Sequence, residues 1–347
     1  MKNAKPVKEM SRGAELLRLG IALLFVIGVI FYAMSVTVGG VSMMLVVASV
    51  VGAYMAMNIG ANDVANNVGP AVGSKALTLG GALLIAAVFE AAGALLAGGE
   101  VVGTIRSGII NPELIADADT FVWIMLGALL AGALWLNLAT AVGAPVSTTH
   151  SIVGAVLGGG MAAAGPQIVD WPTMGNIAAS WVISPVLGGV FAAVFLYLIK
   201  RSITYKSNMS EAAAYMVPIL MGLMGWTFST YLILKGLNRI WPVSFGSAVV
   251  YGLFVGVVTF WFVRKRVSVR ADLIDNSKQS VNALFNVPLI FAAALLSFAH
   301  GSNDVANAIG PLAAIIDVVM SGGVVHSTAA IPTWVMVIGA LGIALGL

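Results

Sequence analysis

Long uncharged stretches follow one another along this 347-residue chain. Residues 19–62, 120–169 and 171–199, among others, contain no Asp, Glu, Lys or Arg. A helix needs about 20 apolar residues to cross the hydrocarbon core of a bilayer. The stretches are continuously apolar instead of alternating, which favours helices over a β-barrel. The pattern predicts helical spans over 19–38, 41–59, 79–98, 121–142, 146–164, 174–199, 213–234, 243–263, 283–302 and from 330 to the end.

The composition supports a membrane protein. Hydrophobic residues make up 60% of the chain and charged residues 9%, whereas soluble domains average roughly 25% charged. The sequence therefore predicts an all-α polytopic membrane protein whose solvent is the lipid bilayer. A net charge of +3 reflects basic flanks and gives no reason to expect nucleic acid. The chain has no cysteine, so thiolate and disulfide chemistry are excluded.

Basic clusters predict the orientation. Five Lys or Arg residues precede the first apolar run, and further clusters occupy 200–206 and 264–270. With these clusters on the cytoplasmic side of the cell membrane, the N-terminus is cytoplasmic and the acidic loop 113–119 lies outside. The run 19–38 is interpreted as a retained helix, because no convincing cleavage site follows it. Segments 121–142 and 146–164 form either two crossings or one re-entrant hairpin.

An internal repeat is the most informative feature. Residues 60–70 read GANDVANNVGP and residues 301–311 read GSNDVANAIGP, which match at eight of eleven positions. The predicted topology runs the two copies in opposite directions, as in transporters built from inverted repeats. The chain then divides into a basic N-terminus (1–18), an extra helix (19–40), a first repeat (41–199), linking helices with a basic loop (200–282) and the start of a second repeat (283–347).

The repeated motif offers ligands for a cation. Carboxylate and amide oxygens suit hard ions such as Na⁺, and a carboxylate at this depth is costly without a cation, a proton or donors. The flanking glycines with Pro70 and Pro311 favour a break in each helix, which would free backbone carbonyls. The alternative is that these side chains only join helices by hydrogen bonds. The candidate ligands are Asn62, Asp63, Asn66, Asn303, Asp304 and Asn307.

A second motif, GAPVSTTH at 143–150, offers donors for an anion. Pro145 can end one helix and allow another to begin. Ser147, Thr148 and Thr149 would then lie in a first helical turn, where free N–H groups favour anions. The alternative is a hydroxyl-rich packing cap. His150 could bind substrate or exchange protons, or could simply pack.

Glu90 lies in the middle of an otherwise neutral predicted helix. A carboxylate at that depth is either a proton or cation site or the partner of a polar helix, and function is the default interpretation.

These motifs together resemble the inorganic phosphate transporter (PiT) family of sodium- or proton-coupled phosphate symporters. The resemblance covers about 41–199 and 283–347, including the stretch around Glu90. It implies two inverted repeats, each with an Asn-Asp helix and a Ser-Thr-Thr re-entrant hairpin. It also implies Na⁺ or H⁺ at Asp63, Asn66, Asp304 and Asn307, phosphate at Ser147, Thr148 and Thr149 with Asn66 and Asn307 beside it, and a transport role for Glu90. A homodimer is compatible with this reading.

One departure from the family pattern stands out. By the spacing of the first half, a second hairpin is expected near position 388, whereas the sequence ends at Leu347 and contains a single PVSTTH. The second repeat is therefore expected to be truncated, and the 347 residues by themselves are expected not to transport.

The sequence predicts a secondary active transporter that imports inorganic phosphate with Na⁺ or H⁺ by alternating access. No covalent cofactor and no enzymatic activity are expected. The nearest alternative is the same fold carrying sulfate, another oxyanion or a metal-phosphate complex. Further alternatives are an intramembrane enzyme with Asp63 and Asp304 as a dyad, and a channel or structural protein. The choice between Na⁺ and H⁺ stays open.

Overall fold

A computed structural model describes residues 12–36, 42–99, 108–237, 241–271, 275–326 and 331–347. Within these ranges the chain is almost entirely helical, and the β-structure consists of one isolated bridge between Ile110 and Val169. Eight of the described helices are long and apolar enough to cross a membrane. The expected all-α polytopic membrane fold is confirmed.

Each predicted span contains a helix; α2 and α11 extend furthest beyond their predicted ends, α9 ends eight residues later than predicted, and the short helix α10 was not predicted. Most of the helices begin at a Ser, Thr, Asp or Asn whose side chain accepts a backbone N–H of the first turn, as expected of helix caps. The bounds are α1 Arg12–Ser35, α2 Met43–Gly73, α3 Leu79–Ala97, α5 Ala118–Ala141, α6 Thr148–Ala164, α7 Trp171–Ile199, α8 Met209–Tyr231, α9 Phe245–Ala271, α10 Lys278–Leu284, α11 Asn286–Met320 and α12 Thr333–Gly346.

The two helices that carry the repeated motif are continuous. α2 has 31 residues and α11 has 35, so the spans predicted as 41–59 and 283–302 were too short. The helix breaks expected near Pro70 and Pro311 are not found, because both prolines lie inside helices. A proline removes one intrahelical hydrogen bond, and in a bundle the packing of neighbouring helices can outweigh that loss. The motif therefore lies in the middle of long helices, not at broken ends.

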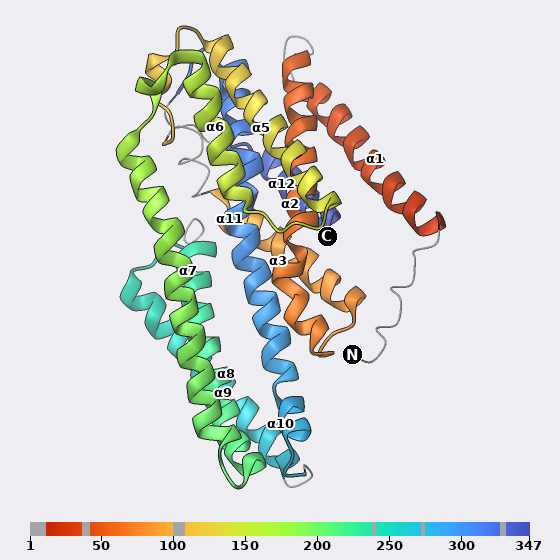
Figure 1. Cartoon of the computed structure of the whole chain (residues 1–347), viewed down its shortest axis with the longest axis vertical. Coiled ribbons are helices and arrows are strands. Elements are labelled where there is room, and N and C mark those ends of the chain that lie inside the picture. Colours follow the sequence, from red (N-terminus) through yellow and green to blue (C-terminus); the bar gives the residue numbers. More distant parts are fainter. Residues whose placement is uncertain (1–11, 37–41, 100–107, 238–240, 272–274, 327–330) are drawn as a thin grey trace.

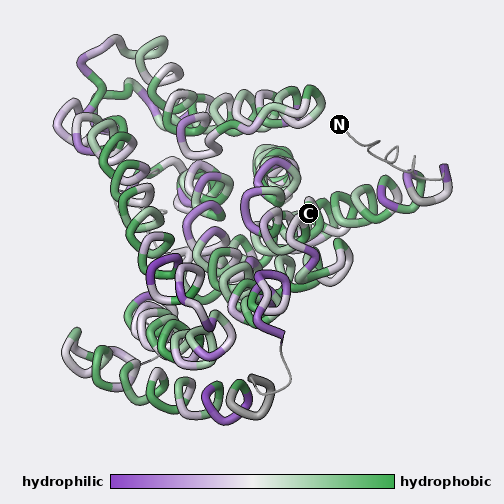
Figure 2. Tube along the Cα trace, turned by 60° about the horizontal axis from the view of Figure 1, so that its bottom comes forward, coloured by the Kyte–Doolittle hydropathy of each residue, from purple (hydrophilic) through white to green (hydrophobic). Residues whose placement is uncertain are grey.

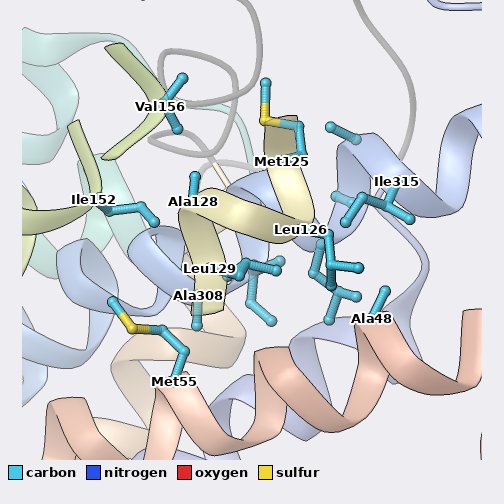
Figure 3. Close-up of a cluster of buried hydrophobic side chains, with 14 of the residues drawn as sticks. Ala48, Met55, Met125, Leu126, Ala128, Leu129, Ile152, Val156, Ala308 and Ile315 are labelled. Atoms are coloured by element: carbon cyan, nitrogen blue, oxygen red, sulfur yellow. The ribbon is translucent and has the colours of Figure 1, made fainter. Parts of the chain in front are cut away.

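α2 and α11 run in opposite directions side by side (Figure 1). Gly52 of α2 packs on Leu312 near the end of α11, whereas Asp63 further along α2 meets His300 earlier in α11. Each motif helix also packs on a helix of the other half: α12 packs on α2, and α3 packs on α11. This arrangement is the inverted repeat that the sequence predicted. Figure 3 shows part of the apolar core that joins the halves, which includes Met55, Leu129, Ile152 and Ala308.

α5 and α6 form a hairpin whose turn lies against the middle of α2 and α11 (Figure 1). α6 has 17 residues, about 26 Å at 1.5 Å per residue, which is shorter than the roughly 30 Å hydrocarbon core. Its far end returns to the start of α5, where the Asn111 N–H donates to the Ile168 carbonyl at 2.7 Å and the Asp170 N–H to the Ile109 carbonyl at 3.1 Å. The structure therefore shows a helical hairpin whose second helix is too short to cross the hydrocarbon core by itself, whereas α5 is long enough to do so.

The outer helices present apolar surface. None of the 29 residues of α7 is buried, although the span Trp171–Thr204 is apolar enough to cross a membrane. Figure 2 shows hydrophobic residues predominating along the helices. Exposed side chains of this kind are suited to lipid tails. The fold is thus a polar centre within an apolar, lipid-compatible exterior.

Candidate functional site

A cavity of about 420 Å³ lies between the hairpin turn and the two motif helices. The residues that line it come from three separate parts of the chain. They include three of the six cation candidates and all three hydroxyl candidates of the sequence analysis. The lining residues are Asp63, Asn66, Pro145, Val146, Ser147, Thr148, Thr149, His300 and Asp304.

Asn62 holds the turn of the hairpin in place. Its amide nitrogen donates to the Thr140 hydroxyl at 2.9 Å and to the Ala144 carbonyl at 3.3 Å. Its amide oxygen accepts the Val146 N–H at 3.3 Å. These contacts satisfy backbone groups that the break between α5 and α6 leaves free. Asn62 therefore supports the hairpin, a role that differs from the cation ligand predicted for it.

α6 begins at the cavity. Ser147 is its N-cap, and the Ser147 hydroxyl accepts the His150 N–H at 3.2 Å. Thr148 and Thr149 are the first two helical residues, whose N–H groups have no partner within a helix. The positive end of the helix dipole and these N–H groups favour a negative ligand. Pro145 precedes the cap, as the sequence predicted.

Asp304 and Asn307 of α11 contact the same first turn. The buried Thr148 hydroxyl donates to Asp304 Oδ2 at 2.8 Å and accepts from Asn307 Nδ2 at 3.2 Å. Asn307 Nδ2 also donates to the Thr149 hydroxyl at 3.1 Å. A single hydroxyl thus connects the carboxylate of one motif to the helix start that faces the cavity.

His300, which the sequence analysis did not single out, lies among three carboxylates. His300 Nε2 is 3.0 Å from Asp304 Oδ2 and 3.4 Å from Asp63 Oδ2, and Nδ1 is 3.2 Å from Glu90 Oε2. These are ion-pair distances, but the angles do not meet hydrogen-bond geometry for either ring nitrogen, for Asp63 Oδ2 or for Glu90 Oε2. His300 stands four residues before Asp304 in a segment without formal charge, and that position was the available signal.

Glu90 reaches this cluster from α3. Its side chain is fully buried, and its Oε1 accepts from Asn67 Nδ2 at 2.7 Å. Gly301 allows the approach, because a Cβ at that position would lie 2.1 Å from the Glu90 carbonyl oxygen. The sequence left open whether Glu90 is a functional carboxylate or a partner of a polar helix. The structure gives it two polar partners on two different helices.

Three of the candidate site residues are exposed and lie at the margin of the polar cluster or outside it. Asn66 is exposed and donates to Asp63 Oδ1 at 3.1 Å. Asn303 is exposed and donates to the Ala299 carbonyl of its own helix at 3.0 Å. His150 is also exposed, with its ring centroid 3.9 Å from that of Trp181. Of the three, Asn66 is the one that lines the cavity.

Comparison with known proteins identifies the family. The model of the phosphate transporter family matches residues 59–347. The chain belongs to the phosphate transporter family. The resemblance stated from the motifs is confirmed, and since members of this family are transporters, the alternative of an intramembrane enzyme is set aside.

Individual phosphate transporter relatives support the assignment. A candidate phosphate permease of Helicobacter pylori is 51% identical over all of this chain. One of Haemophilus influenzae is 39% identical over 87% of the chain. A solved structure, named as the sodium-dependent phosphate transporter, is 36% identical and superposes with a TM-score of 0.80 over 88% of this chain and 75% of its own. The chain spans 66% of the length of the Helicobacter pylori relative and 73% of the Haemophilus influenzae relative.

Proposed function

We propose that this chain forms the core of a secondary transporter that imports inorganic phosphate together with a coupling cation. The observation that carries the proposal is the shared cavity, in which the Thr148 hydroxyl joins Asp304 to the start of α6. A cation at the carboxylates and an anion at the helix start would occupy adjacent parts of one space. The sodium-dependent neighbour favours Na⁺ as that cation over H⁺.

The cation side is argued from charge. Asp63 and Asp304 bring two carboxylates to the cavity from antiparallel helices, and Asp63 is 6% exposed. Burying such groups is unfavourable unless a positive charge meets them. Asn66 and Asn307 add amide oxygens nearby, and the Asn307 Oδ1 is buried without a hydrogen bond. Oxygen ligands of this kind suit Na⁺.

The phosphate side is argued from donors. Ser147 and Thr149 carry hydroxyls at the cavity, and the first turn of α6 supplies backbone N–H groups. Without a cation, Asp63 and Asp304 would repel an anion placed here. Binding of the cation first removes that repulsion and raises the affinity for phosphate, which couples the two solutes.

Alternating access then follows from the inverted repeat. The cavity lies between elements of both halves, so rocking of one half against the other would open it to each side in turn. The loops at 206–208 and 275–277 meet at one end, where Asn276 contacts Ser207 and Met209, and the basic clusters lie near them. We place that end in the cytoplasm of a cell-membrane protein by the positive-inside rule.

Uptake of labelled phosphate into proteoliposomes tests the proposal, with a full-length version that includes the second hairpin expected from the family pattern, and with an imposed Na⁺ gradient in one arm and a pH gradient in the other. Uptake driven by the Na⁺ gradient is expected, and Asp63→Asn or Asp304→Asn should abolish the dependence on that gradient. Asp119→Asn, which changes an exposed carboxylate outside the cavity, is the matched control. Gradient-driven uptake that persists in both cavity variants would remove the cation assignment.

A second substrate has a specific reason to be tested. Hydroxyls and backbone N–H groups recognise a tetrahedral oxyanion without reading its protonation, so sulfate fits the same donors. An excess of unlabelled sulfate should leave phosphate uptake unchanged if the site is selective for phosphate. Strong competition would assign the transporter to oxyanions more broadly.

A further inference from the structure

We propose that an anionic phospholipid of the cytoplasmic leaflet binds in a second cavity, between the linking helices and the start of α11. This cavity has a volume of about 250 Å³, and its lining residues come from α8, α9, α10 and the first turn of α11. Nine of the ten lining residues are apolar, and the tenth is Arg266. The cavity shares no residue with the central one that holds the carboxylates.

The cavity has a buried floor and an exposed mouth. Val217 and Met221 of α8 and Val267 of α9 are buried, whereas Phe262 and Val287 are 53% and 52% exposed. Apolar cavities far larger than one water molecule exclude water and accept apolar groups. Because the mouth of this cavity opens on a surface that faces the bilayer, the apolar group available to fill it is a lipid acyl chain.

Arg266 gives the mouth a positive charge. Its Cζ atom lies 4.9 Å from the centroid of the Phe262 ring, which lines the same cavity. A guanidinium held over a ring keeps the N–H groups at its edge available, and two of them match the two free oxygens of a phosphodiester. Within the described part of the chain, no carboxylate forms an ion pair with Arg266.

The end of α9 has the composition of a membrane–water interface. Each of the basic residues 264–266 lies over the aromatic ring four residues before it, with 4.9–5.9 Å from its charged group to the ring centroid. Aromatic side chains followed by basic ones are typical of the interface, and basic pockets between helices on the cytoplasmic side bind anionic head groups. Met221 lies twelve residues into α8, about 18 Å from its start. The cavity thus extends from head-group depth toward acyl-chain depth.

The start of α11 adds to the positive potential. This helix begins at Asn286 without a side-chain cap, and Val287 in its first turn lines the cavity. Free N–H groups and the positive end of the helix dipole favour a negative ligand, and none of the lining residues is Asp or Glu. The site should therefore prefer a lipid with net negative charge to a zwitterionic one, and the bound lipid would join the linking helices to a motif helix.

Native mass spectrometry of the purified chain in detergent tests the site, with phosphatidylglycerol and phosphatidylcholine of identical acyl chains as probes. The first phosphatidylglycerol should bind about fivefold more tightly than phosphatidylcholine, the factor given by about 1 kcal/mol per basic side chain. Arg266→Gln should abolish this preference. Arg264→Gln is the matched control, because it removes one charge from the same end of α9 but from outside the cavity, and it should change the preference by less than twofold.

A second variant tests the cavity itself. Val287→Trp adds bulk at an exposed position of the mouth and should weaken the binding of both lipids, with elution as for the wild-type chain showing that the fold is intact. Equal affinities for the two lipids, or equal effects of Arg264→Gln and Arg266→Gln, would overturn the proposal. Displacement of phosphatidylglycerol by soluble glycerol 3-phosphate would also overturn it, since the site would then bind a free anion. None of these readouts depends on phosphate uptake, so the proposed function is tested separately.

Discussion

The two copies of the repeated motif share eight of eleven residues but have different surroundings. In the first copy, Asn62 contacts the hairpin turn, whereas its equivalent Asn303 is exposed and bonds only within its own helix. The seventh residues of the motif, Asn66 and Asn307, show the opposite pattern. Asn66 is exposed, whereas Asn307 is buried against Thr148 and Thr149.

The difference shows how the same motif can have two structural roles. α2 and α11 run antiparallel, so equivalent residues approach the single described hairpin from opposite directions. One copy supports the turn with its first Asn, and the other receives the start of α6 with its second. Position along the chain decides the role, because the motif itself is nearly the same in both helices.

A second asymmetry concerns charge. His300 and Ile59 are equivalent, as are Ala308 and Asn67. The histidine of the second copy and the extra asparagine of the first both contact Glu90 of α3. The copies are therefore complementary halves of one polar cluster and not two separate sites.

The largest effect is expected where the copies behave alike. A Cβ at Gly60 would lie 2.1 Å from the Ile343 carbonyl oxygen, and one at Gly301 would lie 2.1 Å from that of Glu90. Gly60→Ala and Gly301→Ala should each destabilise the fold by about 1–3 kcal/mol or more, since backbone cannot move aside as a side chain can. Thermal unfolding in detergent measures this, with Gly69→Ala, which meets no atom within 4 Å, as control. A stable Gly301→Ala variant would contradict the close helix contact.

Asn307→Ala against Asn66→Ala tests the asymmetry at the start of α6. Removing Asn307 leaves the buried Thr148 hydroxyl without a donor and should cost about 1–3 kcal/mol. Asn66 is exposed, so its loss should change stability by only about 0.5 kcal/mol or less. Equal effects in unfolding experiments would mean that the two copies contact the hairpin alike.

Comparing Asn62→Ala with Asn303→Ala tests the asymmetry at the hairpin turn. Here the first copy of the motif is expected to be the more sensitive one. Asn62 makes three hydrogen bonds to the hairpin, of which two go to backbone groups, and its removal should cost about 1–2 kcal/mol. Asn303→Ala should be nearly neutral, because its one bond stays within its own exposed turn. Protease accessibility of residues 142–147 should rise in the first variant only. A rise in both would argue against the assigned division of roles.

The smallest effect is expected at the base of the hairpin, away from both motifs. The Thr120 N–H and hydroxyl donate to the Asp117 carboxylate and hold the pKa of this group below its usual 3.8. Because that pKa is lowered on folding, the stabilisation is present above the usual pKa and is lost as pH falls through the folded value. Asp117→Ala should therefore lower the unfolding temperature slightly at neutral pH and not at strongly acidic pH.

A matched variant separates capping from charge in that test. Asp117→Asn keeps a capping oxygen and should be close to wild type at neutral pH. A loss of stability at Asp117→Ala larger than that at Asn62→Ala would mean that the hairpin depends on its base more than on the motif contacts at its tip.

Much of the fold could be predicted from local pattern. Uncharged runs gave the helices, and caps such as Asp117 and Ser147 gave their starts, because bilayer burial and helix ends each require particular residue types. The prediction of helix breaks at Pro70 and Pro311 was wrong, because packing around α2 and α11 outweighs the local tendency of proline to end a helix. His300 escaped attention because a single histidine has no periodicity or repeat partner to mark it.

The sequence alone determined the membrane character, the inverted repeat and the family, because hydrophobicity and motif spacing are written along the chain. The tertiary structure decided which copies of the asparagines meet the hairpin, and it brought His300 and Glu90 to Asp63 and Asp304. The contacts of His300 with Asp63 and with Glu90 join residues more than 200 positions apart. All of these contacts depend on how α2, α3, α11 and the hairpin pack, and no short stretch of sequence encodes that packing.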